Sequence, residues 1–565
     1  MIDTPRSMTG KFPAFDFPGA IFRKPTQKFL RKITHESELA DILTTRAGLG
    51  SLDFIDQIFE QLNFTYQVSA RDRQNIPDEG RVLVYANQPL ASLHALALVR
   101  LVAEVRKDIR LVIDEQESEF GALGSLIIQS GPNAEEAIQQ ALAAEQAVIL
   151  FPTGNFAKVR PQNRSWRSDL LHYCRATKTP LLPVLVQVQK SWRTLSSGLV
   201  PTSLKNLLAQ AKQPLASMVK INVGELIAPG ALQSGQLNDR ALLQRLKKHI
   251  HKLRKNHKSP FETLKTIAHP EDRCELRKDL KQADLLGETR DNQGIYLVEY
   301  QCDTLMREIG RLREFTFRKV GEGTGSKRDL DNYDRHYQHL VLWNHEQLEV
   351  AGAYRLGHVA SILQDQGIDG LYTSSLFNFT DHFLPLLPQA VELGRSFVNP
   401  KFWGKNSLDY LWQGIGAYFR HHPDVRYVFG PVTISADYPK HLTEEMVFFY
   451  EHFYSHGAPL AEGRLPFTLP HHRQQALQVK YGQHDKESGF KLLQAEFAEL
   501  GYKVPVLFKQ YAALYEEGGF QLLGFNIDPD FANCIDGLFI ADLNQLKANK
   551  RKRYLGDEAT VNAAG

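Results

Sequence analysis

Residues 391–400, Val-Glu-Leu-Gly-Arg-Ser-Phe-Val-Asn-Pro, place two ionisable side chains, Glu392 and Arg395, in a predicted strand. Residues three apart on a regular strand point to opposite faces, but a bulge at Gly394 would bring Glu392 and Arg395 to the same side. A buried carboxylate such as Glu392 can act as a general base. Backbone N–H groups at a strand bulge can stabilise a developing oxyanion.

A short turn and three upstream segments add further candidate side chains. The turn at 401–406, Lys-Phe-Trp-Gly-Lys-Asn, contains Gly404 and Lys405 and opens a predicted amphipathic helix. Strand, bulge, turn and helix N-terminus together form a place where backbone N–H groups can meet a phosphate or a thioester oxygen. The upstream candidates are Arg311 and Phe315 on a helix, Asp331 and Asp334 in an acidic loop, and Arg355 on a strand.

These residues belong to a predicted succession of strands and helices. In the C-terminal half, strands are expected at 295–300, 340–343, 350–356 and 390–398, helices at 305–317 and 407–420, and a Gly-rich loop at 321–325. In the N-terminal half, strands are expected at 81–86, 109–113, 147–151 and 179–187, and helices at 91–105 and 134–146. In the N-terminal half, alternating strands and helices favour helices packed on a mostly parallel sheet, and the fold class predicted for both halves is α/β.

The composition fits a folded chain of more than one domain. The 565 residues exceed one domain of roughly 100–200 residues. The 67 Lys and Arg residues nearly balance 64 Asp and Glu residues, and the net charge of +3 gives no argument for nucleic acid. The four cysteines form no CxxC pair and no metal-ligand spacing stands out, so we predict no metal site. No segment has the roughly 18–20 uninterrupted apolar residues of a transmembrane helix.

The order of the C-terminal motifs resembles the GNAT superfamily, and within it the amino-acid N-acyltransferases that make ornithine-type lipids. The resemblance covers about residues 290–555. It implies catalytic roles for Glu392, Arg395 and Arg355, substrate binding by Asp331, Asp334, Arg311 and Phe315, and donor binding by Gly404 and Lys405. It also implies that no cofactor is bound and that the acyl donor is an acyl-carrier-protein thioester or an acyl-CoA.

A second resemblance, over about residues 60–230, is to the glycerolipid acyltransferase family. The segments that show this resemblance are 87–95, 151–155 and 180–183, each next to a predicted strand. That family uses a His with a nearby Asp, and the positions expected for them hold Gln88 and His94. Gln129 stands at an expected Arg, and Asn155 at an expected Glu. A glutamine amide is no base near neutral pH, so the resemblance implies a domain that has lost O-acyltransferase activity.

The two resemblances together predict the domain organisation. Residues 1–235 are expected to form a glycerolipid-acyltransferase-like mixed sheet with helices and degenerate motifs. Residues 236–290, which contain a dense run of Lys and Arg, are expected to form a basic helical linker. Residues 291–565 are expected to form a GNAT-like N-acyltransferase domain with a C-terminal extension. This order resembles the bifunctional ornithine-lipid synthases of bacteria, which are often named hemolysins, although nothing here indicates a pore former.

The sequence therefore predicts an enzyme that moves a (3-hydroxy)fatty acyl group to the amino group of an ornithine-like amino acid, giving a lyso-aminolipid. Two alternatives stay open, namely a fully bifunctional synthase that adds the O-acyl group too, and a non-catalytic scaffold that binds lipid or carrier protein. The expected partners are acyl-carrier protein, the amino-acid substrate and an anionic membrane surface. We expect a cytoplasmic protein with peripheral contact to the inner face of the cytoplasmic membrane.

Overall fold

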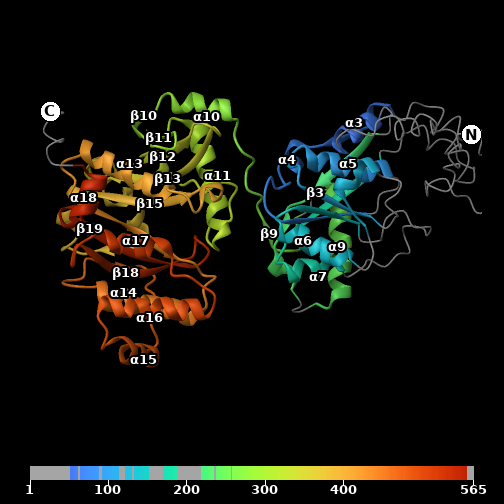
Figure 1. Ribbon diagram of the computed structural model, residues 1–565. Coiled ribbons are helices and arrows are strands. Elements are labelled where there is room, and N and C mark those ends of the chain that lie inside the picture. Colours follow the sequence, from blue (N-terminus) through green and yellow to red (C-terminus); the bar gives the residue numbers. More distant parts are fainter. Residues whose placement is uncertain are drawn as a thin grey trace, which may run out of the picture. The chain divides into compact units, whose positions relative to one another are not determined.

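The computed structural model describes residues 51–61, 64–87, 92–113, 121–129, 133–151, 169–188, 218–233, 237–255 and 258–556. The chain divides into two compact units, Met1–His269 and Pro270–Gly565. In Figure 1, unit 1 runs from blue to green and unit 2 from green to red. Both units combine sheets with helices, which confirms the predicted α/β class.

Unit 1 contains a mixed sheet in the order β1-β7-β6-β2-β5-β3-β4, with β8 pairing β6 and β9. The strands are β1 Thr65–Val68, β2 Val82–Ala86, β3 Ile109–Ile113, β4 Ile127–Gln129, β5 Ala147–Leu150, β6 Leu181–Val188, β7 Met218–Val223, β8 Leu226–Ile227 and β9 Thr263–Leu264. The strand β2 is parallel to both of its neighbours, β5 and β6, whereas β6 and β7 are antiparallel.

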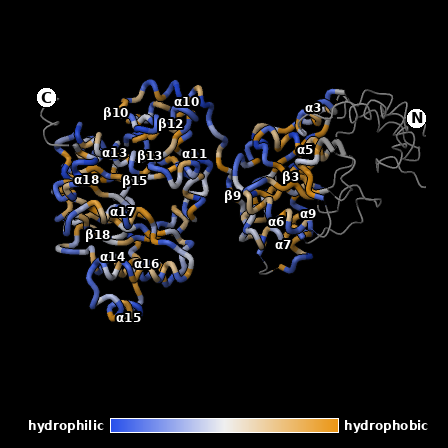
Figure 2. The backbone as a smooth tube through the Cα atoms, viewed as in Figure 1, coloured by the Kyte–Doolittle hydropathy of each residue, from blue (hydrophilic) through white to orange (hydrophobic). Residues whose placement is uncertain are grey.

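Helices cover both faces of this sheet. Successive strand residues point to opposite faces, so Val82 and Val84 belong to one core cluster and Leu83 and Tyr85 to another. The helices α3 Ser51–Gln61 and α5 Ser92–Ala103 pack in the first cluster, and α6 Ala134–Ala143, α7 Asp169–Ala176 and α9 Asp239–Lys252 in the second. A short helix, α4 Ala70–Arg73, lies between β1 and β2. Figure 2 shows the hydrophobic segments gathered inside the unit.

Residues 236–290, predicted as a basic helical linker, are divided between the two units. Leu242, Leu246 and Ile250 recur on one side of α9 and are at most 3% exposed in the core of unit 1. Farther along, α10 Arg273–Leu280 packs in a core cluster of unit 2, and β10 Asp284–Glu288 joins the sheet of unit 2. The basic residues cover the outer side of a core helix, and the unit boundary falls between His269 and Pro270.

Unit 2 contains an eight-stranded sheet in the order β10-β11-β12-β13-β15-β16-β19-β18. Its further strands are β11 Gln293–Val298, β12 Gln338–Asn344, β13 Glu349–His358, β15 Ala390–Val398, β16 Tyr427–Ile434, β18 Phe520–Asp528 and β19 Cys534–Asp542. A two-stranded sheet joins β14 Phe377–Phe379 and β17 Ala461–Gly463. All neighbours in the large sheet are antiparallel except β15 and β16, which are parallel.

Helices also cover both faces of the large sheet. On one face α11 Asp303–Lys319 packs with Val341 and Ala353, and on the other α13 Ser407–His421 packs with Leu340 and Leu342. The remaining helices are α12 Val359–Gln366, α14 Lys440–Tyr454, α15 His471–Tyr481, α16 Lys486–Glu499, α17 Val506–Leu514 and α18 Ala548–Tyr554. Among the helices that the structure describes, none has the length and apolar character needed to cross a membrane.

Candidate active site

The strand β15 contains the predicted bulge, one residue later than expected. Arg355 of β13 lies opposite Gly394, but Ala353 lies opposite Phe397, so β15 has one extra residue in this stretch. Arg395 itself has a φ of +48°, a left-handed conformation that an L-residue adopts only at a cost. A bulge changes the direction of its side chain. Arg395 is thereby directed toward the acidic loop.

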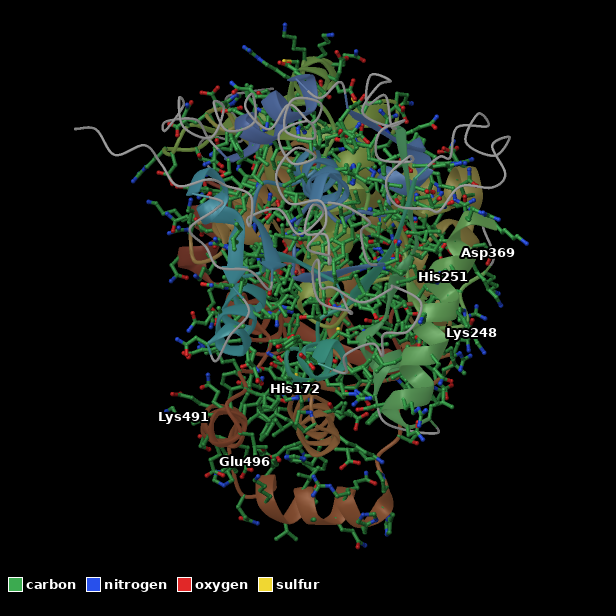
Figure 3. The ribbon with its side chains drawn as sticks, turned by 90° about the vertical axis from the view of Figure 1, so that its right-hand side faces the viewer. His172, Lys248, His251, Asp369, Lys491 and Glu496 are labelled. Atoms are coloured by element: carbon green, nitrogen blue, oxygen red, sulfur yellow. The ribbon has the colours of Figure 1, made fainter. Side chains whose placement is uncertain are left out.

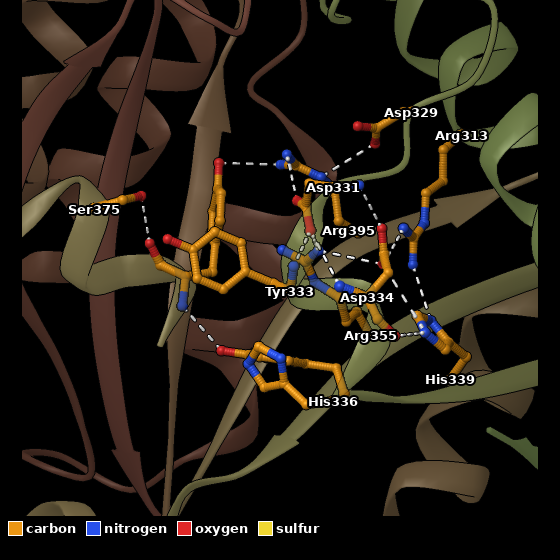
Figure 4. A network of polar contacts seen from close by, with 12 residues as sticks. Arg313, Asp329, Asp331, Tyr333, Asp334, His336, His339, Arg355, Ser375 and Arg395 are labelled. Carbon is orange, nitrogen blue, oxygen red and sulfur yellow. Dashed lines mark hydrogen bonds and ion pairs between the residues drawn. The ribbon is translucent and has the colours of Figure 1, made fainter. Parts of the chain in front are cut away.

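Three arginines and three aspartates form one buried network (Figure 4). The Arg355 Nη1 atom donates to Asp331 Oδ1 at 2.7 Å and to Asp334 Oδ1 at 3.3 Å. The Arg395 Nε atom lies 3.1 Å from Asp329 Oδ2, and its Nη2 donates to Asp331 Oδ2 at 3.5 Å. The structure therefore brings together the predicted residues Arg355, Arg395, Asp331 and Asp334, and it adds Asp329.

The third arginine is Arg313, which the sequence analysis missed. Its Nη1 atom donates to Asp334 Oδ1 at 2.8 Å, and its Nη2 lies 3.1 Å from His339 Nδ1. The predicted residue Arg311 lies two positions away, which is about 200° around a helix. Arg311 pairs with Glu308 at 2.7 Å.

The predicted aromatic residue, Phe315, is likewise two positions before the aromatic residue that reaches the site. The Phe315 ring lies under the ammonium group of Lys319, at 5.0 Å from its centroid. Phe317, two residues on, lines the large cavity described below. Arg313 and Phe317 have the same spacing as Arg311 and Phe315, so the sequence contains two such pairs and only the structure distinguishes them.

The charges of the network set the protonation of its members. Burial disfavours ionisation of Asp334, but Arg313 and Arg355 outweigh it and hold the pKa of this carboxyl group well below its usual range. Burial and the charge of Arg313 lower the pKa of His339 to about 3, so its ring is neutral near pH 7. A neutral ring can accept a hydrogen bond from Arg313 on Nδ1. The network thus holds Asp334 ionised beside one neutral imidazole, whereas burial raises the pKa of Asp329.

Glu392 connects to this network through aromatic rings. Its Oε2 atom accepts a hydrogen bond from the Tyr337 hydroxyl at 2.5 Å, and its Oε1 accepts one from the Thr373 N–H at 2.8 Å. The ring of Tyr372 contacts two guanidinium groups. Its centroid lies 5.0 Å from the Arg355 Cζ atom and 4.6 Å from the Arg395 Cζ atom. With both oxygens bonded and 1% exposure, Glu392 fastens the turn at Tyr372–Ser375 to β15.

A cavity of about 680 Å³ opens beside the network, where two strands part. The parallel pairing of β15 with β16 ends after Glu392 and Phe429, although each strand stays paired with its other neighbour. Residues of both strands line the cavity beyond this point, namely Arg395, Ser396, Phe397, Val398, Pro431, Val432 and Thr433. Backbone groups on the facing edges therefore have no strand partner there and can meet a ligand.

The cavity touches the network only in part. Tyr372 and Arg395 line it, whereas Glu392, Arg355 and the network aspartates are not among its lining residues. Two other carboxylates, Glu322 and Asp536, do line it. Sequence analysis singled out the loop that carries Glu322 but not its carboxylate. Glu392 thus lies close to the network, through Tyr337, but does not line the cavity.

The predicted donor-binding turn lies at the same cavity. Gly404, with a φ of +75°, and Lys405 both line it, just before the N-terminus of α13. The Lys405 ammonium lies 5.1 Å from the centroid of the Phe402 ring, which also lines the cavity. Trp403 beside them is 48% exposed. The turn therefore borders the cavity with two aromatic side chains, Phe402 and Trp403, and one cation.

The candidate positions in unit 1 are mostly outside the described residues. This applies to Gln88, to Asn155 and to the side chain of His94, whose backbone belongs to α5. Gln129 is described, and it is an exposed residue at the end of β4. At the start of the first motif, Asn87 bonds the backbone of Val186 in both directions and ties the end of β2 to β6.

No group of three or more potential metal ligands occurs among the residues that the structure describes. The described polar network is held by arginine, and a guanidinium group does not bind metal ions. The geometry therefore shows a ligand cavity at a parted strand pair, bordered by a fixed guanidinium group and two carboxylates.

Comparisons with known proteins agree with this geometry in unit 2. Residues 312–413 match the family described as the acetyltransferase (GNAT) domain. The chain is 31% identical over 299 residues to a glycine N(alpha)-acyltransferase of Bacteroides thetaiotaomicron, covering 50% of this chain and 88% of the relative. It is 30% identical over 130 residues to an L-ornithine N(alpha)-acyltransferase of Brucella abortus, covering 20% and 45%.

Among solved structures, the chain is similar to the 1-acyl-sn-glycerophosphate acyltransferase PlsC from Thermotoga maritima. The similarity has a TM-score of 0.28 at 16% identity and covers 42% of this chain and 99% of that one. The predicted loss of O-acyltransferase activity in the N-terminal half stays a prediction.

Proposed function

Because the chain belongs to the family of bacterial amino-acid N(alpha)-acyltransferases, we propose that unit 2 transfers a fatty acyl group from a thioester to the α-amino group of an amino acid. Glycine and ornithine, which the relatives' names give, are the first acceptors to consider. The observation that carries the proposal is the cavity at the parting of β15 and β16. Its lining joins apolar side chains, which suit an acyl chain, to ionisable ones, which suit an amino acid.

The reaction balances without a covalent enzyme intermediate. The nitrogen lone pair attacks the thioester carbonyl carbon, a C–N bond forms, and the C–S bond breaks. The nitrogen gives up two protons in all, one to a base and one to the departing sulfur, which leaves as a thiol. The developing oxyanion needs fixed donors. Arg395 and the unpaired backbone N–H groups of β15 supply positive potential at the cavity wall.

The network around Asp334 then has a positioning role. It holds Arg395 in its strained conformation through Asp329 and Asp331. Glu392 fixes the turn that carries Tyr372 and thereby the other side of the same guanidinium group. In this proposal, Glu392, Asp331 and Asp334 support the reacting groups from behind, and Arg395 faces the substrate.

The donor is proposed to be an acyl-carrier-protein thioester or an acyl-CoA. Both present the thioester on a flexible arm that follows a phosphate, and carrier proteins are acidic. Lys405 and Lys503 are exposed and line the cavity, so they can meet either group. The product is a lyso-aminolipid. We propose no second, O-acylating step, because Gln88 and Asn155 replace the base and the carboxylate of the resembling family.

An assay with purified full-length protein tests this function. The protein is mixed with a 3-hydroxyacyl thioester, on CoA or on carrier protein, and with glycine or ornithine. We expect free thiol and an N-acyl amino acid to form in equal amounts. Thiol release without an amide product would indicate a thioesterase and would contradict the proposal. Supplying the N-acyl product with more thioester should give no ester, and an ester that disappears in His94→Ala would assign activity to unit 1.

The proposed product is a lipid, and we propose that α9 contacts the anionic membrane into which it passes. Its outer side is exposed and basic, and Figure 3 shows Lys248 and His251 there. In the other basic cluster, residues 550–553, Arg553 is held by Asp409 and Arg551 donates to the Leu543 carbonyl. The α9 cluster therefore has more cations available for lipid.

Replacing both Lys248 and Lys252 by Gln should weaken binding to anionic vesicles about thirtyfold, since each charge near the surface contributes about 1 kcal/mol. The measurement is sedimentation with vesicles at two salt concentrations. As a control, the exposed pair Lys491 and Lys509 on other helices is changed to Gln, with no expected effect. Binding that is insensitive to both salt and the α9 change would refute this contact.

A further inference from the structure

The Gly-rich loop at residues 321–325 brings one carboxylate, Glu322, to the cavity. Gly321 has a φ of +76°, a left-handed conformation that favours glycine, and a Cβ atom there would meet the Asp437 carboxylate just after β16. The loop is also fixed by Glu314, whose Oε2 accepts hydrogen bonds from the Thr324 N–H at 3.1 Å and hydroxyl at 2.8 Å. Glu322 between these fixed points is held at the cavity wall.

A second carboxylate, Asp536, reaches the same cavity from β19. Its Oδ1 atom accepts a hydrogen bond from the Thr433 hydroxyl at 2.7 Å, and the residue is 2% exposed. Within the described part of the chain, neither Glu322 nor Asp536 has an ion pair with Lys or Arg. Among the cations that line the cavity, Arg395 is already paired with Asp329 and Asp331, and Lys405 and Lys503 are exposed side chains.

A third polar residue that lines this cavity is Thr316. Thr316 of α11 is 6% exposed, and its hydroxyl has no hydrogen-bond partner among the described residues. Buried hydroxyl groups are nearly always hydrogen-bonded. An unsatisfied hydroxyl in the same cavity as two carboxylates that have no ion pair with Lys or Arg among the described residues therefore points to a ligand that carries positive charge and hydrogen-bond donors.

We propose that Glu322, Asp536 and Thr316 bind the amino group of the amino-acid acceptor and that Glu322 accepts the proton which this group must lose. An ammonium group has three N–H donors and one positive charge, which matches two carboxylates and a hydroxyl. After the proton passes to Glu322, the lone pair of the neutral amine attacks the thioester carbon. Glu322 later loses this proton to water. This assignment rests on the proposed function and replaces Glu392 as the base.

The electrostatics of the pair support proton acceptance. Burial and the charge of Asp536 raise the pKa of Glu322 to about 8. Burial likewise raises the pKa of Asp536 to about 6, although its Thr433 hydrogen bond opposes this, and Asp528 and Arg395 also act on it. Tyr438 and Cys534 also interact electrostatically with Glu322, and the Asp437 carboxylate lies close to the neighbouring Gly321. A base with a pKa near the working pH is the most effective kind.

The test compares Glu322→Gln with wild type in the N-acylation assay. We expect kcat to fall by about 10²–10⁴-fold, the range typical for loss of a general base. The KM for the acyl thioester should change little. The variant can use only the fraction of the amino acid whose amine is already neutral. This fraction rises about tenfold per pH unit below the amine pKa, so the rate of the variant should rise equally and approach that of wild type at alkaline pH. Asp536→Asn and Thr316→Val should raise the KM for the amino acid.

The control is Glu499→Gln, an exposed residue of α16, which should behave as wild type. Glu322→Gln should melt no lower than wild type, since it removes a carboxylate that burial and Asp536 disfavour. A folded Glu322→Gln variant with wild-type kcat at neutral pH would overturn the proposal. Inactivity of the wild type itself would refute the proposed function, so the two failures are distinct. If Glu322→Gln failed to fold, unchanged amino-acid KM values in Asp536→Asn and Thr316→Val would overturn the site.

Discussion

Replacing Arg395 by methionine should lower the rate of N-acyl transfer by roughly 10²–10³-fold, the loss typical when one donor to an oxyanion is removed. Arg395 lines the cavity, and its side chain is held on three sides by Asp329, Asp331 and the Tyr372 hydroxyl. Methionine keeps much of the apolar side chain but removes the charge and the donors. The measurement is kcat/KM for amide formation, with circular dichroism to confirm folding.

Arg395→Lys provides the matched comparison. It keeps the charge but lacks the planar fork that bonds three partners at once. We expect activity between that of Arg395→Met and wild type. Full activity in a folded Arg395→Met variant would mean that the guanidinium group serves the fold alone, and the assignment of this cavity wall to the reacting carbonyl would have to be abandoned.

Replacing Asp334 by asparagine should lower the free energy of unfolding of unit 2 by about 3–5 kcal/mol, the cost of removing one partner from a buried ion pair. Asp334 is fully buried, bonds Arg313 and Arg355, and accepts from the Asp331 N–H at 2.8 Å. Asparagine has nearly the same shape but no charge. Urea unfolding measures the change, and the exposed Asp365→Asn serves as a control with an expected effect below about 0.5 kcal/mol.

The same network makes unit 2 sensitive to acid. The pKa of Asp334 is depressed in the folded state, so its contribution to stability is present above the ordinary carboxyl pKa and is lost as the pH falls below it. The pKa of His339 is lowered from 6.5 to about 3, so stability already declines below about pH 6.5 as the unfolded chain takes up this proton. His339→Phe should remove the decline between about pH 6.5 and pH 4. An unchanged pH profile in this variant would show that His339 does not titrate on unfolding.

The elements of unit 2 could be predicted, but their contacts could not. The strand at 390–398 and the helix at 407–420 agree closely with β15 and α13, because local alternation and amphipathic spacing define them. The residue range of α11 could be predicted, but the side of the helix that faces the arginine–aspartate network could not. Nearly every residue from Leu305 to Phe317 is buried, so no exposed face distinguishes Arg311 from Arg313.

Two other differences come from interactions between distant residues. Glycine is the usual residue for a left-handed bulge, yet the bulge falls on Arg395 because Asp329 and Asp331 hold its side chain. The charged run before residue 290 concealed an apolar stripe on α9, which only the core of unit 1 explains. Likewise, Glu322 meets Asp536 through the sheet, at a sequence separation that no local pattern can indicate.

The most direct test of N-acyl transfer by this chain is mass spectrometry of lipids extracted from cells that express the full chain, compared with cells that express Arg395→Met. We expect a new lipid in the first culture and not in the second. This lipid is an amino acid with one acyl group on its α-nitrogen. A diacylated product would show that the N-terminal half is active after all. Identical lipid profiles in the two cultures, with both proteins folded and present at equal levels, would contradict the assignment of this chain as an amino-acid N-acyltransferase.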